Sequence, residues 1–341
     1  MIILSNTIFR ICRTFALVFL ILGTAFFLTF TVKMPGKSYS GTLSAPGKDT
    51  KELMTRMKSH VVFLGSEIGE RNIWEYKALQ KAEKYIENNF KKWEYPIQVQ
   101  NFNVQGKSVK NIIAKKWGTT KKDEIILIGA HYDSVYGSPG ANDNASGVAA
   151  LLELARVFIS AKTERSIFFA AFVNEEPPFF QTEKMGSLVY ARYCREKKLK
   201  IKAMLSFDVI GYYSNKKGSQ SYPFPLNFFY PDTGNFIAFV ANGASQKLQR
   251  FCISFFRENT KFPTEGVAGP PVLPGIGWSD HWSFWQENYA ALLLTDTGPF
   301  RYPQYHLRSD TPEHLDYKSM AIVVSGIRRL IDELLRSDKF N

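Results

Sequence analysis

Short apolar runs alternate with helical patterns over the last two-thirds of the chain. Apolar runs of strand length cover residues 125–130, 166–173, 203–207 and 289–294. Helical spacing of apolar positions covers residues 145–161, 184–197, 235–259 and 317–336. Strands that alternate with helices pair mainly in parallel, because each helix returns the chain to the same edge of the sheet. The pattern predicts an α/β fold in which helices cover both faces of a mainly parallel sheet.

The residues before this region predict two helices and a hairpin. Residues 52–64 and 73–90 have helical spacing, and the second segment alternates lysine with glutamate, which is typical of an exposed face. Residues 97–104 and 109–117 alternate as strands do, on either side of a Gln105-Gly106 turn.

Two later segments, residues 214–231 and 261–280, are long for loops in a compact domain. Loops of that length are often functional, for example as the walls of a binding site. Their aromatic residues are equally suited to packing against the domain.

The N-terminus carries the strongest apolar signal in the sequence. Arg10 and Arg13 precede residues 15–32, which contain no charge. Eighteen helical residues reach about 27 Å, enough to cross the hydrocarbon core of a bilayer. Gly23-Thr24-Ala25 also reads as a small-residue cleavage site, so a secreted protein released from a signal peptide is the alternative. We expect an uncleaved anchor with the domain outside the cytoplasm, in the periplasm or a lumen.

These signals divide the chain into three parts. Residues 1–36 are expected to form the transmembrane segment. Residues 37–51, rich in Gly, Ser, Thr and Pro, are expected to form a linker. Residues 52–341 are expected to form the folded domain.

Composition and charge exclude few classes of function. The 341 residues are 45% hydrophobic, which supports a sizeable core, and the formal net charge is +12. No nucleic-acid motif accompanies the basic excess, so we expect no nucleic-acid partner and interpret the charge as a solvated surface, with membrane proximity second. Cys194 and Cys252 are compatible with a disulfide and with two buried thiols. The serine hydrolase motif Gly-x-Ser-x-Gly does not occur.

Side chains that can bind a metal or transfer a proton lie where the apolar runs end. His131 and Asp133 follow the first run and point to the same face of an extended segment. A carboxylate in that position can hold a metal-bound imidazole through its second nitrogen, and Asp143 follows closely enough to add an oxygen ligand. The same residue types also occur in ordinary turns. However, the second run ends in Glu175 and Glu176, the third in Asp208, and the fourth leads to His306, and four such endings together favour a shared site.

Six segments carry a resemblance to a known family. GAHYDS, GANDNASG, NEE, SFDVIGYY, SDHWSFW and YHLRSDTPEHLDY resemble, in order, the co-catalytic zinc aminopeptidases of the M28 family. The resemblance covers roughly residues 125–331. It implies a three-layer α/β/α sandwich with a mixed, mainly parallel central sheet, here preceded by the transmembrane helix.

The resemblance also implies a role for each matching residue. Two zinc ions per chain are expected, one bound by His131 and Asp208, the other by Glu176 and His306, with Asp143 bridging them. Glu175 would be the general base, and Asp133 would orient His131. Tyr305 would either hydrogen-bond the tetrahedral intermediate or serve as an aromatic packing residue. Asp280 would help shape the substrate pocket, and a cis peptide would follow Asp143.

Other residues have weaker signals. Asn144 stands where many relatives carry aspartate, and Pro177-Pro178-Phe179-Phe180 is a bulky insertion beside the expected site. His281 is expected to be structural, and His60 and His314 are expected on the surface. Asp310 reads either as a partner of His306 or as a helix cap.

The predicted function is therefore a membrane-anchored metallo-aminopeptidase that acts on peptides with a free N-terminus. A glutaminyl-peptide cyclotransferase with a single zinc is the alternative on the same fold. A non-catalytic ectodomain is the third hypothesis, and the presence of every expected ligand argues against it. The oligomeric state cannot be read from the sequence.

Overall fold

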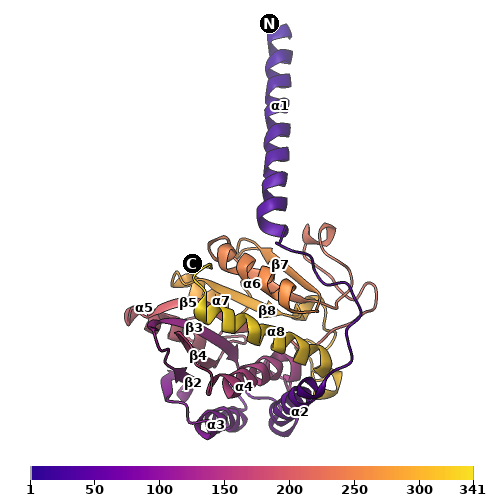
Figure 1. Ribbon diagram of the computed structural model, residues 1–341. Coiled ribbons are helices and arrows are strands. Elements are labelled where there is room, and N and C mark those ends of the chain that lie inside the picture. Colours follow the sequence, from indigo (N-terminus) through magenta and orange to yellow (C-terminus); the bar gives the residue numbers. More distant parts are fainter. Residues whose placement is uncertain (1, 341) are drawn as a thin grey trace.

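An eight-stranded mixed sheet forms the centre of the domain (Figure 1). The computed structural model describes residues 2–340. The strands are β1 (Ile97–Val104), β2 (Lys107–Lys116), β3 (Lys121–His131), β4 (Arg165–Phe172), β5 (Lys200–Phe207), β6 (Ile237–Ala241), β7 (Thr264–Ala268) and β8 (Ala291–Thr295). Their order is β1-β2-β4-β3-β5-β8-β6-β7, with β4, β3, β5 and β8 parallel to one another.

Helices cover both faces of this sheet, as the pattern predicts. Beyond α1 (Ile2–Phe26), they are α2 (Lys48–Val62), α3 (Tyr76–Lys92), α4 (Gly147–Phe158), α5 (Gly186–Glu196), α6 (Gln246–Asn259), α7 (His281–Gln286) and α8 (Tyr317–Arg336). The side chains of α2, α3, α4, α6 and α8 share one buried cluster, and those of α5 and α7 share the other. Alternate residues of β3 enter the two clusters, which explains why this strand reads as a continuous apolar run.

The parallel strands bring four chain segments to one edge of the sheet. His131 ends β3, residues 174–176 follow β4, Asp208 follows β5, and the segment that leads to His306 follows β8. Chain segments that leave the carboxyl ends of parallel strands meet at that edge, where open α/β sheets form their sites. The strand order therefore places the predicted site residues together.

Two predicted elements are wrong. The helix expected over residues 235–259 is β6 followed by α6, and the loop expected over residues 261–280 begins with β7. Residues 236–241 are all apolar and buried, so they fit the interior of a helix and a strand equally well. Residues 237–241 form a strand because they pair with β8 on one side and β7 on the other.

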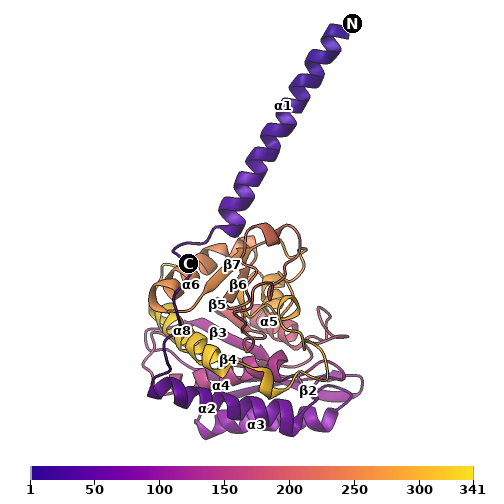
Figure 2. The same ribbon diagram turned by 90° about the vertical axis from the view of Figure 1, so that its right-hand side faces the viewer.

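The N-terminal helix stands away from the domain (Figures 1 and 2). Residues Phe9–Phe26 form a span that is long and apolar enough to cross a membrane, and none of it is buried by the rest of the chain. From its foot the chain runs down the side of the domain to α2 (Figure 1).

The first part of this descending segment is fastened to α6 and β7. Arg250 donates a hydrogen bond to the Lys33 carbonyl (2.7 Å), and Arg257 donates to the Pro35 carbonyl (3.0 Å). Ser38 accepts a hydrogen bond from the Thr264 amide (2.8 Å).

Three further predictions concern the burial of side chains. His60, expected on the surface, is buried because α2 packs on α4, where His60 lies 3.5 Å from the Glu153 carboxylate and contacts the Tyr85 hydroxyl. That prediction is wrong, whereas His314 is exposed as expected. Cys194 and Cys252 are free and buried in different helices, which agrees with the buried-thiol alternative.

Candidate active site and metal centre

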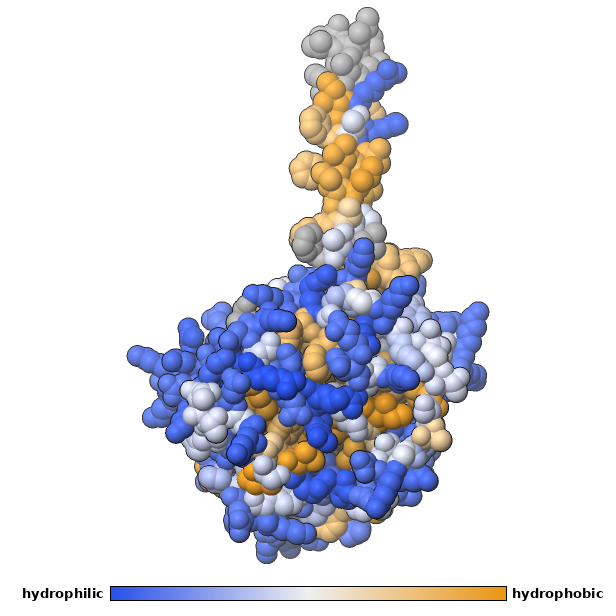
Figure 3. Space-filling model, viewed as in Figure 1, coloured by the Kyte–Doolittle hydropathy of each residue, from blue (hydrophilic) through white to orange (hydrophobic). Residues whose placement is uncertain are grey.

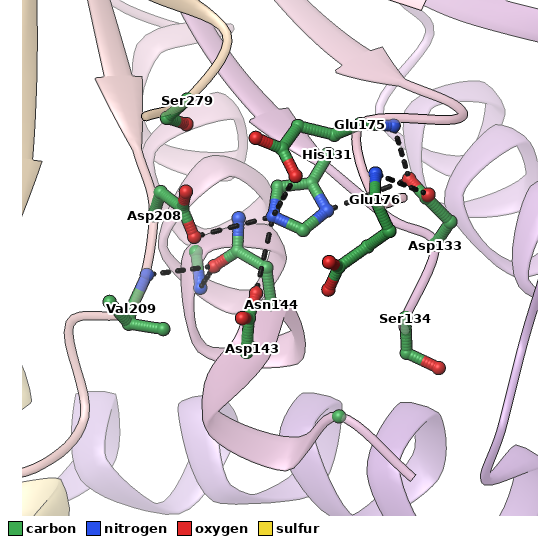
Figure 4. A network of polar contacts seen from close by, with 12 residues as sticks. His131, Asp133, Ser134, Asp143, Asn144, Glu175, Glu176, Asp208, Val209 and Ser279 are labelled. Carbon is green, nitrogen blue, oxygen red and sulfur yellow. Dashed lines mark hydrogen bonds and ion pairs between the residues drawn. The ribbon is translucent and has the colours of Figure 1, made fainter. Parts of the chain in front are cut away.

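Two of the predicted ligands, Asp143 and Asp208, face the imidazole of His131 (Figure 4). Its Nε2 lies 3.3 Å from Asp143 Oδ1 and 3.3 Å from Asp208 Oδ1. Its Nδ1 lies 3.5 Å from Asp133 Oδ1. One ring nitrogen therefore faces two carboxylates, while the other faces the residue expected to orient the ring.

A second imidazole lies on the other side of Asp143. His306 Nε2 is 3.0 Å from Asp143 Oδ2 and 3.3 Å from Glu176 Oε2. Asp143 thus directs one oxygen toward His131 and the other toward His306. A carboxylate shared in this way by two imidazole groups has the arrangement of a bridging ligand.

The donor atoms form compact sets that suit a metal. His131, Asp143 and Asp208 offer ligand atoms within 4.8 Å of one another, and so do Asp143, Glu176 and His306. Asp143 Oδ1 is buried and accepts no hydrogen bond from the described residues, so it is free to bind a cation. Imidazole and carboxylate donors in such groups fit zinc.

Glu175 lies beside these sets and itself forms a third compact set with His131 and Glu176. Its Oε2 is 3.9 Å from His131 Nε2. Burial raises the pKa of its carboxyl group well above the ordinary value, with Asp208 and Glu176 adding repulsion and His131 opposing the shift. A raised pKa favours proton uptake, which a general base requires, and burial raises the pKa of Glu176 in the same direction.

Asp133 aligns both glutamates through their backbone. Its two carboxylate oxygens accept hydrogen bonds from the amides of Glu175 and Glu176, each at 3.2 Å. Glu176 Oε1 in turn accepts from the Val135 amide (3.1 Å). Asp133 therefore connects the end of β3 to the end of β4 and fixes where the two adjacent glutamates diverge.

The backbone around the site is bent at several non-glycine residues. Asn174, Val209 and His306 have φ values of 60°, 47° and 59°. Such left-handed backbone costs of order 1–3 kcal/mol per residue and persists where the surrounding contacts enforce it. The bends turn the chain sharply beside the strand ends. The Asp143–Asn144 peptide is cis, which confirms the prediction from the resemblance.

Asn144, which departs from the family pattern, joins two backbone segments through its side-chain amide. Its amide nitrogen donates to the Phe207 carbonyl (2.8 Å), and its amide oxygen accepts from the Gly147 amide (3.0 Å). Aspartate at this position would have no hydrogen to donate to Phe207. Asn144 therefore connects the loop before α4 to the end of β5, next to Asp208.

Arg71 supports the site from outside the predicted set of residues. Fully buried Arg71 donates to the carbonyls of Tyr132, Pro139 and Gly140. Nothing in its local sequence predicts this role.

Asp310 and Asp296 hold the same loop from the opposite side. Asp310 accepts from the amides of Asn142 (2.8 Å) and Asp143 (3.1 Å), so its partner is the bridging loop rather than His306. Asp296 accepts from the Asn142 side chain (3.0 Å). Asp296 directly follows the fourth apolar run, so the sequence pattern could have marked it as a fifth carboxylate at a strand end. Asp310 lies in a segment with the pattern of a turn.

A largely apolar cavity adjoins the candidate metal site. Asp208 and Tyr305 line its end at the site, and Tyr222, Leu226, Phe236 and Ile276 are among its walls. Both long loops of the sequence contribute, as expected for binding walls. Glu265 also lines the cavity, and burial raises the pKa of its carboxyl group, with Arg257 at 3.4 Å opposing that shift.

The remaining predicted residues surround the site. Tyr305 stacks on His306 with ring centroids 3.9 Å apart, and burial beside Asp143 raises the pKa of its hydroxyl group. Asp280 is fully buried and is not among the cavity-lining residues. His281 is fully buried, and its Nε2 donates a hydrogen bond to the Ile276 carbonyl, as expected of a structural histidine. Phe179 of the proline-rich insertion packs on Trp74.

Comparison with known proteins agrees with this geometry. Peptidase family M28 matches residues 111–331. The chain is 35% identical over 285 residues to the uncharacterized protein YfbL of Escherichia coli K12, covering 81% of this chain and 87% of that one. It is 29% identical to aminopeptidase YwaD of Bacillus subtilis 168, covering 67% of this chain but only 45% of that longer protein.

Solved structures share the fold at low sequence identity. A zinc aminopeptidase from Bacillus subtilis superposes with a TM-score of 0.68 at 17% identity, covering 84% of this chain and 96% of that one. A glutaminyl cyclase from Bacteroides thetaiotaomicron superposes with a TM-score of 0.61 at 18% identity, covering 84% and 99%. Both kinds of enzyme therefore occur on this architecture.

Proposed function

The chain belongs to peptidase family M28, and we propose that it is a zinc-dependent aminopeptidase anchored in a membrane by α1. Residues 1–36 would be the anchor, residues 37–51 the linker and residues 52–341 the peptidase domain, outside the cytoplasm. The observation that carries the proposal is Asp143, whose two oxygens face His131 and His306 separately. A cyclotransferase with a single zinc does not require a shared carboxylate.

Two zinc ions would be held by the two ligand groups that share Asp143. Such ions lower the pKa of a water molecule and offset the charge that develops on the substrate carbonyl oxygen. His131 and Asp208 would form one group, and Glu176 and His306 the other.

Glu175 would act as the general base and then as the general acid. Its carboxylate, beside both ligand groups but not needed by either, would accept a proton from the attacking water and return it to the amine that leaves. The ring of Tyr305 stacks on His306, which places its hydroxyl group near the carboxylates. This hydroxyl would donate a hydrogen bond to the oxygen of the tetrahedral intermediate. Asp133 would keep His131 and both glutamates in position.

The environment of the site favours substrates with a free N-terminus. Glu175 and Asp208 offer negative charge to a substrate α-ammonium group, and an acetylated N-terminus has no such charge. The adjoining apolar cavity would accept the side chain of the first residue. Apolar walls select by buried area, and Glu265 at the wall would repel an acidic side chain. We expect release of neutral hydrophobic residues such as Leu, Phe or Met in preference to Asp or Glu.

Turnover of anilide substrates tests the proposal directly. Leucyl-, phenylalanyl- and glutamyl-anilides would be compared with acetyl-leucyl-anilide and a glutaminyl peptide, using zinc-loaded full-length protein and its Glu175→Gln variant. We expect leucine and phenylalanine release that the variant lacks. Cleavage of the acetylated substrate would contradict recognition of the α-amine. Formation of pyroglutamate without leucine release would replace the aminopeptidase with the cyclotransferase.

A further inference from the structure

Three exposed phenylalanines gather on the loop formed by residues 222–230. Phe224, Phe228 and Phe229 are 78%, 69% and 37% exposed, and the rings of the first two contact each other. Exposed aromatic groups of this size in water favour contact with an apolar partner. The same loop turns Tyr222, Leu226 and Tyr230 inward, where they line the cavity beside Asp208.

The position of this loop along the membrane normal follows from one contact. Phe229 packs on Phe27, with ring centroids 5.9 Å apart. Phe27 immediately follows the apolar span Phe9–Phe26. If that span crosses the bilayer, Phe27 lies at its boundary, and Phe229 lies at the same depth. Figure 3 shows apolar surface on the domain next to the foot of α1.

The chain below α1 is held closely enough to keep this arrangement. Lys33 and Pro35 are bound by Arg250 and Arg257 of α6, and Ser38 is bound by β7. Tyr230 of the loop donates to the Gly266 carbonyl of the same strand (2.6 Å). The foot of α1 and the phenylalanine loop are therefore attached to one edge of the sheet.

We propose that residues 222–230 rest in the interfacial layer of the bilayer that holds α1, with Phe224, Phe228 and Phe229 among the lipids. Aromatic side chains are enriched at this layer in membrane proteins. The partner is the lipid bilayer, because the patch is continuous with the membrane-spanning helix through Phe27. The proposal rests on the proposed anchoring by α1. It places one wall of the cavity at the membrane surface, within reach of peptides that lie there.

An environment-sensitive probe on the loop tests this proposal. Full-length protein with Cys12→Ser would carry an additional Phe228→Cys for nitrobenzoxadiazole labelling, because Cys194 and Cys252 are buried. A matched variant would carry Lys77→Cys, on exposed α3 at the far end of the domain (Figure 1). Both would be reconstituted in phosphatidylcholine vesicles, with retention after an alkaline carbonate wash measured in the same samples.

We expect the probe at 228 to shift to shorter wavelength, brighten several-fold and be quenched by lipid-borne nitroxide, while the probe at 77 responds only to aqueous iodide. Washed vesicles that retain the protein while both probes respond to iodide alike would overturn the loop contact and leave the anchor intact. Loss of the protein from washed vesicles would overturn the anchor and the loop contact together. Hydrolysis of leucyl-anilide in the same samples reports separately on the proposed catalytic function.

Discussion

Replacement of Arg71 by alanine tests whether a residue upstream of the matched family region supports the site. Its guanidinium donates hydrogen bonds to five backbone carbonyls, those of Leu64, Gly69, Tyr132, Pro139 and Gly140. The side chain is fully buried, and burial lowers its pKa only to about 10, so it remains charged at neutral pH.

The expected loss of stability follows from these contacts. A hydrogen bond from a charged donor contributes about 1.5–3 kcal/mol, but losses from one side chain do not add, since removing Arg71 also removes its own desolvation cost. Breaking a buried charged interaction from one side costs about 3–5 kcal/mol. We therefore expect Arg71→Ala to lower the free energy of unfolding by about 4 kcal/mol. For a domain of roughly 300 residues this corresponds to a Tm about 6 °C lower.

Thermal unfolding of the detergent-solubilised, zinc-loaded protein measures this loss. Arg71→Lys keeps the charge but not the planar fork, so we expect an intermediate fall in Tm. Arg328→Ala, which removes a half-exposed arginine of α8, should change Tm little and serves as the control. A fall of less than 1 °C for Arg71→Ala, with zinc content unchanged, would refute the view that this guanidinium holds the loop before Asp143.

Three further predictions concern the metal, the base and pH. Glu175→Gln should reduce kcat by about 10²–10⁴-fold with zinc content unchanged, whereas Glu176→Gln should reduce zinc content; the reverse pattern would contradict the assignment. Elemental analysis should give two zinc ions per chain, and chelation should lower Tm because the clustered carboxylates then repel one another; a stable stoichiometry of one would favour the cyclotransferase. Burial lowers the pKa of His281 to about 4, so below pH 6.5 the unfolded chain binds a proton that the folded chain does not. The free energy of unfolding should therefore fall as pH decreases from 6.5 to 4, by on the order of 3 kcal/mol in total. Urea unfolding of His281→Gln should show a shallower fall, and parallel curves for the two proteins would contradict this.

The sheet was predictable because its central strands are apolar on both faces. Residues of β3 and β4 enter both buried clusters, and their runs are too short for buried helices. Strand β6 and the edge strand β7 were missed, because five-residue strands leave little periodicity to read. Their identity depends on the pairing of β6 with β8 and with β7, and both are contacts between segments distant in sequence.

The site was predictable to the extent that its residues end strands. His131, Glu175, Glu176 and Asp208 leave parallel strands at one edge, so topology alone brings them together. Arg71 acts through backbone carbonyls of segments up to 69 residues away, and such partners have no side-chain signature. His60 was misplaced for a related reason, since its burial depends on how α2 packs on α4.

The fastening of the N-terminal segment has a consequence for β7, the outermost strand on its side of the sheet. An open strand edge presents unpaired amides and carbonyls to which another strand can add. Here Ser38 accepts from the Thr264 amide, Arg257 donates to the Thr264 carbonyl, and Tyr230 donates to the Gly266 carbonyl. Side chains thus occupy the positions that a ninth strand would need. These contacts oppose β-augmentation at the Thr264 end of the edge, where an extended peptide or a neighbouring copy of the chain would have to displace them.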